Sequence, residues 1–101
     1  MRVILKEPGC TPREVETDGT LEALQNLVGG YLEHMRIADG LGLLFDEEGK
    51  LKGKRVNLTT DYDAIVGNVI VVGDDGEDLT EVPEDRICEA MDFLRRYTLR
   101  R

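Results

Sequence analysis

A cluster of basic and polar side chains in the middle of the chain is the strongest candidate for binding chemistry. It consists of Lys50, Lys52, Lys54 and Arg55, followed by Asn57, Thr59 and Thr60. Cations and hydroxyls supply the hydrogen-bond donors that a phosphate or a nucleotide requires. Lysines that alternate along a hairpin arm also protect an exposed strand edge against aggregation, so this simpler interpretation stays open.

Carboxylates are concentrated nearer the C-terminus, where nine acidic residues and one arginine lie between Asp74 and Asp92. The first four could form an acidic interaction surface that imitates DNA phosphates, or a loop for a divalent metal. They are Asp74, Asp75, Glu77 and Asp78. The segment lacks the alternating ligands and the distal glutamate of an EF-hand, so we predict no metal site. A solvated turn and helix face explains the same pattern, and we favour it.

Few side chains could act in catalysis. His34 is the only histidine, and it lies in a predicted strand with no serine or cysteine near it in the sequence. A lone strand histidine is more often structural, so we predict no catalytic residue and keep a small enzyme using His34 or Cys10 as an alternative. Cys10 and Cys88 lack the spacing of a zinc site, and we expect free thiols. We expect no cofactor.

Length and charge limit the classes of protein that fit. A chain of 101 residues is the size of one domain, which we place at residues 1–101. The formal net charge of −8 argues against direct binding to nucleic acids or anionic membranes. No apolar run approaches the roughly 20 residues needed to span a bilayer, and the N-terminus lacks the apolar region of a signal peptide. We therefore expect a cytoplasmic protein.

The hydrophobic pattern predicts an alternation of strands and helices. It indicates strands at residues 2–6, 12–17, 31–37, 41–45 and 69–72, and helices at residues 21–28 and from Pro83 onward. Thr20 can cap the first helix, and Gly29 can end it. Residues 50–68 are predicted as a long loop, which in a small domain is usually functional or flexible.

The resulting order is ββαββ, a loop, then βα. We expect an α+β fold, a two-layer sandwich in which a mostly antiparallel sheet carries two helices on one face. The apolar stretch at residues 65–72 and the side chains of Tyr31, Met35 and Ile37 could form a homodimer contact if they are exposed, although burial in the core is the simpler explanation.

Five segments of the chain occur in an order typical of one protein family. They are Glu7-Pro-Gly9, Thr20 to Glu33 with its Leu-x-x-Leu-Val-Gly-Gly-Tyr block, Asp46 to Gly53, Ile65-Val-Gly67 and Val71 to Asp78. Together they resemble domain-of-unknown-function family 3846 over nearly the full chain. The resemblance implies a small accessory protein of phages, plasmids or their bacterial hosts, and it carries over no catalytic residue. Many relatives have Pro-Pro-Asn or Pro-Asn-Arg in the loop where this chain has Lys54-Arg-Val-Asn57, so a ligand of that loop need not be shared.

These observations lead to one functional expectation with two alternatives. We expect a binding module without enzyme activity that takes a host protein or a small, anionic, nucleotide-like ligand. The first alternative is an acidic decoy that competes with DNA for a host DNA-binding or defence protein. The second is the small enzyme that uses His34 or Cys10.

Overall fold

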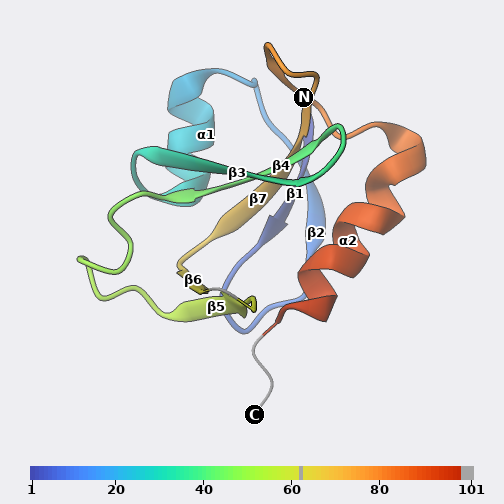
Figure 1. Ribbon diagram of the computed structural model, residues 1–101. Coiled ribbons are helices and arrows are strands. Elements are labelled where there is room, and N and C mark those ends of the chain that lie inside the picture. The colour runs from blue at the N-terminus through green and yellow to red at the C-terminus, as the bar shows by residue number, and fades with distance from the viewer. Residues whose placement is uncertain (62, 99–101) are drawn as a thin grey trace.

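A central sheet with two helices packed against it organises the chain, as the computed structural model shows for residues 1–61 and 63–98 (Figure 1). The strands are β1 (Arg2–Lys6), β2 (Arg13–Glu16), β3 (Leu32–Ala38), β4 (Leu41–Asp46), β5 (Val56–Thr59), β6 (Ala64–Val66), β7 (Val69–Asp74) and β8 (Leu79–Thr80). The helices are α1 (Leu21–Val28), the 3-10 turn η1 (Glu84–Arg86) and α2 (Ile87–Arg96).

The main sheet has the strand order β2-β1-β7-β4-β3, and β8 pairs with β7. All of these pairings are antiparallel. Strand β7 lies in the middle, where Val71 is opposite Ile4 of β1 on one side and Leu43 of β4 on the other. Strands β5 and β6 form a separate antiparallel pair. The α+β class and the mostly antiparallel sheet are therefore confirmed.

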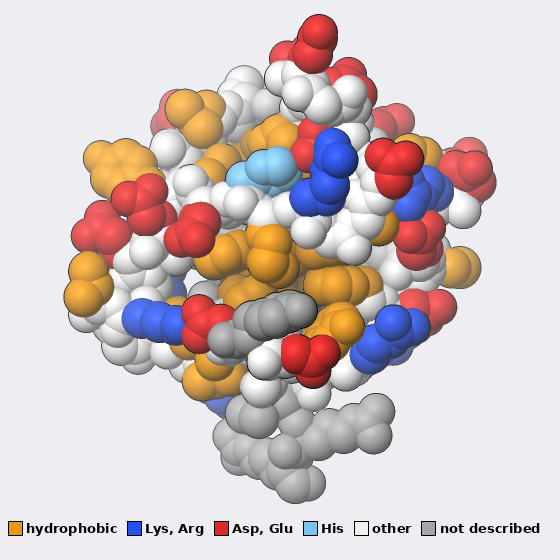
Figure 2. Space-filling model, viewed as in Figure 1, with side chains coloured by type: hydrophobic (Ala, Val, Ile, Leu, Met, Phe, Trp, Pro, Cys, Tyr) orange, Lys and Arg blue, Asp and Glu red, His pale blue; other side chains and the backbone are white. Residues whose placement is uncertain are grey.

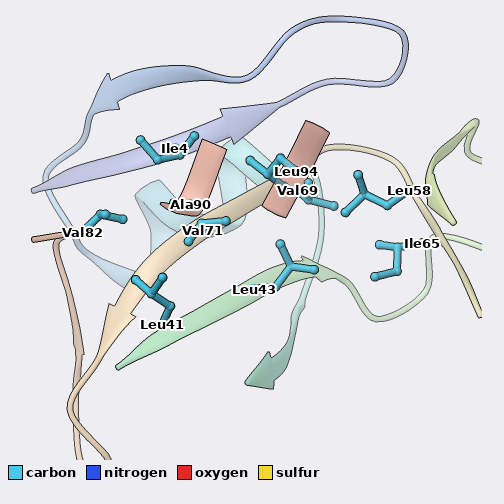
Figure 3. Close-up of a cluster of buried hydrophobic side chains, with 10 residues drawn as sticks. All are labelled: Ile4, Leu41, Leu43, Leu58, Ile65, Val69, Val71, Val82, Ala90 and Leu94. Carbon is cyan, nitrogen blue, oxygen red and sulfur yellow. The ribbon is translucent and has the colours of Figure 1, made fainter. Parts of the chain in front are cut away.

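The two helices cover opposite faces of the sheet, which corrects the expectation that both lie on one face. Leu24 and Val28 of α1 pack in a cluster with Ile70 and Val72 of β7. Ala90 and Leu94 of α2 pack in another cluster that contains Val69 and Val71, the alternate residues of the same strand (Figure 3). Because successive side chains of a strand point to opposite faces, the arrangement has three layers, helix, sheet and helix.

The ends of α1 follow from local chemistry. The Thr20 hydroxyl accepts a hydrogen bond from the Ala23 N–H at 3.1 Å and caps the first turn. Gly29 ends the helix at φ 85°, a left-handed conformation that costs glycine little. The start and the end of this helix were both predicted from these residues.

The segment at 50–68 contains the short pair β5–β6, which corrects its prediction as a loop. This pair is joined to the C-terminal end of α2, since the Thr59 N–H donates to the Tyr97 carbonyl at 2.7 Å and Leu58 forms a β-bridge with Thr98. The β1–β2 turn, β5 and the end of α2 thus come together at one end of the molecule, the lower end in Figure 1.

Candidate functional site

The predicted basic cluster does not form one site, because two of its lysines are used inside the structure. The Lys52 and Lys54 ammonium groups lie 2.8 Å and 2.7 Å from Oδ2 of Asp46, whose side chain is fully buried. Lys54 also donates to the carbonyls of Val28 and Gly29 at the end of α1. These two lysines therefore neutralise a buried carboxylate and stabilise the negative end of a helix dipole.

Two opposing effects set the protonation of Asp46. Burial raises the pKa of its carboxyl group, but hydrogen bonds from Lys52, Lys54 and the Glu48 N–H outweigh burial and lower the pKa to about 2. The same interaction raises the pKa of Lys52. Both groups are thus held in their charged forms, as a structural ion pair requires.

The other members of the cluster are also spread over more than one place on the surface. Lys50 pairs with Asp63 at 2.5 Å on the exposed surface, and the Thr60 hydroxyl donates to the Asp63 carbonyl at 2.9 Å. Thr59 is exposed at the end of β5. Only Arg55 and Asn57 of the predicted ligand-binding residues line the pocket described next.

A cavity of about 710 Å³ lies where the β1–β2 turn, β5 and the end of α2 meet. Its volume is within the range of small-molecule sites in proteins. It is lined by Lys6, Gly9, Cys10, Thr11, Pro12, Arg55, Val56, Asn57, Arg95 and Thr98. Three of these residues are cations and none is acidic, although the whole chain carries a net charge of −8.

Lys6 and Asn57 form the buried wall of the pocket, and each is 1% exposed. The Lys6 ammonium donates to Oδ1 of Asn57 at 2.5 Å and to the Glu7 carbonyl at 3.4 Å. The Asn57 amide in turn donates to the carbonyls of Lys6 and Gly67 at 2.9 Å and 2.8 Å. Among residues 1–61 and 63–98, no carboxylate pairs with the Lys6 ammonium.

The buried position of Lys6 changes the pKa of its ammonium group. Burial lowers the pKa of its ammonium group, nearby Cys10 raises it in part, and the Arg55 guanidinium lowers it again. Arg55 is exposed and forms no ion pair within the described part of the chain. Arg95 contributes the third cation, and its Nη1 lies 3.5 Å from Oδ1 of Asp92. The pocket therefore concentrates positive charge that the protein itself leaves largely unpaired.

Sequence reasoning missed most of this pocket. Lys6 was placed only in the strand at residues 2–6, and Arg95 only within the helix predicted from Pro83 onward. One feature of the sequence could have indicated the buried lysine. Lys6 directly follows the apolar run Val3-Ile-Leu5, and a charged residue at that position must be either exposed or given a polar partner. That partner is Asn57, which lies fifty-one positions away in the chain.

The predicted acidic surface is one turn between β7 and β8. The Asp75 carboxylate accepts hydrogen bonds from the N–H groups of Asp78 and Glu77 at 2.7 Å and 2.9 Å, which lower its pKa. Asp74 is buried and accepts from the Gly76 N–H. Two of the four carboxylates thus shape the turn, while Glu77 and Asp78 are exposed. Figure 2 shows that acidic side chains also extend along the margins of this face. The decoy role stays a prediction.

His34 pairs with Asp74 across the intervening strand β4. Its Nε2 lies 3.0 Å from Oδ2 of Asp74, and a Cβ at Gly42 would lie only 2.6 Å from that nitrogen. The absence of a side chain at Gly42 therefore allows the contact. The sequence contains no serine, and neither cysteine contacts this pair in the described residues. The geometry fits a structural role, in which the His34–Asp74 pair links β3 to the β7–β8 turn.

This tie predicts a modest effect on stability. We expect H34A to lower the free energy of unfolding by about 0.5–1 kcal/mol, since His34 is half exposed and Asp74 keeps its bond to Gly76. Gly42→Ala should lower it further, because the new Cβ displaces the imidazole. Urea denaturation of both variants measures the effect, and an H34A variant as stable as the wild type would show that the pair contributes nothing.

Three further features concern the thiols, the possible metal ligands and the lengths of the helices. Cys10 and Cys88 are both free and exposed. Within the described residues, no group of three or more histidine, cysteine, aspartate or glutamate side chains could hold a metal ion. No helix in that part of the chain is long and apolar enough to cross a membrane.

The fold and the site define an acidic α+β domain with a pocket lined by cations. The chain belongs to the family described as "Domain of unknown function (DUF3846)", whose model matches residues 1–97. Comparisons with curated proteins and with solved structures found no significant match. The family assignment agrees with the resemblance seen in the sequence and leaves the activity to be argued from the pocket.

Proposed function

We propose that the chain is a binding module without enzyme activity that holds a small anionic ligand, such as a phosphate compound, in the pocket of Lys6, Arg55 and Arg95. A role as an accessory protein of a phage or another mobile element is part of the same proposal. The observation that carries it is the convergence of three cations, from β1, the residue before β5, and α2, on one cavity of a protein with a net charge of −8.

The donor groups of the pocket suit an oxyanion. An ammonium group has three N–H donors, and the two acceptors of Lys6 leave one of them for a ligand. Arg55 offers a guanidinium without an ion pair in the described residues, and such groups bind phosphate in a bidentate way. Because Lys6 is buried, its positive charge acts through little water and attracts an anion more strongly than a surface lysine does.

The residues that line the cavity also indicate which kind of anion would bind there. No aromatic side chain among the described residues lines the cavity, so a nucleobase has no ring to stack on. We therefore favour a compact phosphate compound over a ligand recognised mainly by its base.

Isothermal titration calorimetry with pyrophosphate tests the proposal. We expect saturable one-to-one binding, and we expect Arg55→Gln to weaken it about tenfold or more because one charge-assisted contact contributes about 1.5–3 kcal/mol. The matched control is Lys50→Gln, which removes the same charge from an exposed residue outside the pocket. Equal losses in the two variants would indicate nonspecific attraction, and absence of binding to the wild type would contradict the proposal.

A further inference from the structure

We infer that Lys6 is a reactive amine and that the pocket takes an anionic carbonyl compound, such as a phosphorylated aldehyde or an α-keto acid, as an imine on that amine. This inference rests on the proposed anion site and adds the second functional group of the ligand. The anionic group lies with Arg55 and Arg95, and the carbonyl carbon lies at the Lys6 nitrogen.

The first support is the isolation of the Lys6 side chain. Lys6 ends β1, where it is paired with Val69 of β7, and it is 1% exposed while lining the cavity. Its acceptors are an amide oxygen and a carbonyl oxygen, both neutral. A buried ammonium group without a carboxylate loses hydration that no ion pair replaces, so its equilibrium shifts toward the neutral form.

The protonation of Lys6 supports the same conclusion. Burial lowers the pKa of Lys6, and the Arg55 guanidinium contributes in the same direction. A lowered pKa places a larger fraction of the amine in the neutral form at neutral pH, and that form carries the lone pair that attacks a carbonyl. Desolvation and a neighbouring cation are the two ways in which proteins activate lysine for imine formation.

The other lysines of the chain lack this environment. Lys50 pairs with Asp63, and Lys52 and Lys54 both pair with Asp46. Their side chains are 57%, 42% and 23% exposed, so each is more accessible than Lys6. Accessibility alone would make Lys6 the least reactive of the four lysines, and its environment makes it the most reactive.

The chemical step is balanced without a further reactant. The amine nitrogen adds to the carbonyl carbon, a C–N bond forms, and the carbonyl oxygen leaves as water with two protons, so no atom is oxidised or reduced. Protonation of the imine then restores a positive charge at the position of the original ammonium group. That charge faces the anionic group held by Arg55 and Arg95, which stabilises the adduct.

The test uses the wild-type chain with pyridoxal 5′-phosphate, followed by borohydride reduction and peptide mapping by mass spectrometry. We expect Lys6 to be labelled about tenfold or more above Lys50, Lys52 and Lys54. Pyridoxal, which lacks the phosphate, should label Lys6 much less, and an excess of pyrophosphate should protect it. The three other lysines serve as internal controls, so the experiment does not depend on the folding of a variant.

The outcomes separate this inference from the proposed function. Labelling that is equal at all four lysines, or absent from Lys6, overturns the reactive amine. If pyrophosphate still binds the same preparation in calorimetry, the anion site stands without it; if pyrophosphate does not bind, both proposals fail. Lys6→Arg cannot form an imine, so we expect this variant to lose the label at position 6 while Lys50, Lys52 and Lys54 keep theirs.

Discussion

Replacing Asp46 with asparagine should lower the free energy of unfolding by about 3 kcal/mol, as expected when one partner is removed from a buried ion pair. The Asp46 side chain is fully buried and contacts two ammonium groups. Without its charge, Lys52 and Lys54 lose the partner that compensates their desolvation, and the end of α1 loses a fixed cation. Urea denaturation of D46N and the wild type measures the difference.

The same residue predicts how stability depends on pH. Its pKa in the folded chain is about 2, below the ordinary 3.8, so the unfolded chain binds the proton first as the pH falls. The contribution of Asp46 is therefore complete above about pH 4 and is lost as the pH falls through about 2. D46N should show a shallower loss of stability over this range than the wild type.

The matched control for Asp46 is Asp63→Asn, which removes the exposed partner of Lys50. An exposed pair contributes little, so we expect this variant to lose less than about 0.5 kcal/mol. If D46N and D63N have equal stability, or if D46N follows the acid unfolding of the wild type, the ion pair at Asp46 does not stabilise the fold as argued.

Asn57→Ala should also cost about 3 kcal/mol, because it removes three buried hydrogen bonds and leaves their partners unpaired. The amide of Asn57 connects β1, β5 and the turn before β7 through Lys6 and Gly67. The variant should also bind pyrophosphate more weakly, since Lys6 loses the contact that positions its ammonium group.

Asn68→Ala is the matched control for Asn57. The Asn68 amide makes a single hydrogen bond, to the Leu27 carbonyl at 3.1 Å, and its side chain is only partly buried. We expect this variant to lose about 1 kcal/mol and to bind pyrophosphate normally. Chemical denaturation and calorimetry on the two variants decide the point, and similar behaviour of both would remove Asn57 from the site.

The elements that were predicted correctly are those defined by residues close together in the sequence. The caps of α1 at Thr20 and Gly29 and the strands β1, β4 and β7 all lie where the sequence indicated them. Strands β5, β6 and β8 were missed because they are two to four residues long and are formed by pairing with distant segments.

The placement of the helices could have been predicted from two strands. Val3-Ile-Leu5 and Val69 to Val72 are buried at every position, without alternation between apolar and polar residues. A strand that is apolar on both faces requires cover on both faces, as in sheets between two layers of helices. A sheet covered on one face only fits strands in which apolar and polar residues alternate, such as β2.

The candidate site was harder to predict because its charges come from three distant segments. Neighbouring lysines in the sequence suggested one basic patch, but the turn that follows β4 brings Lys52 and Lys54 to Asp46 and leaves Arg55 at the pocket. Burial of Lys6 depends on Asn57, and no local spacing indicates that contact. The homodimer contact through Tyr31, Met35, Ile37 and residues 65–72 stays a prediction. Met35 and Ile37 pack partly buried against the core, and Tyr31 is exposed.

The most direct test of the anion pocket is an NMR titration of the ¹⁵N-labelled chain with pyrophosphate. We expect the amide signals that shift to belong to the residues around the cavity, namely Gly9, Cys10, Thr11, Arg55, Asn57 and Thr98. The signals of Lys50 and Lys52 should stay in place, because these lysines lie outside the pocket. Shifts confined to residues 50–54, or no shifts at all, would contradict the account.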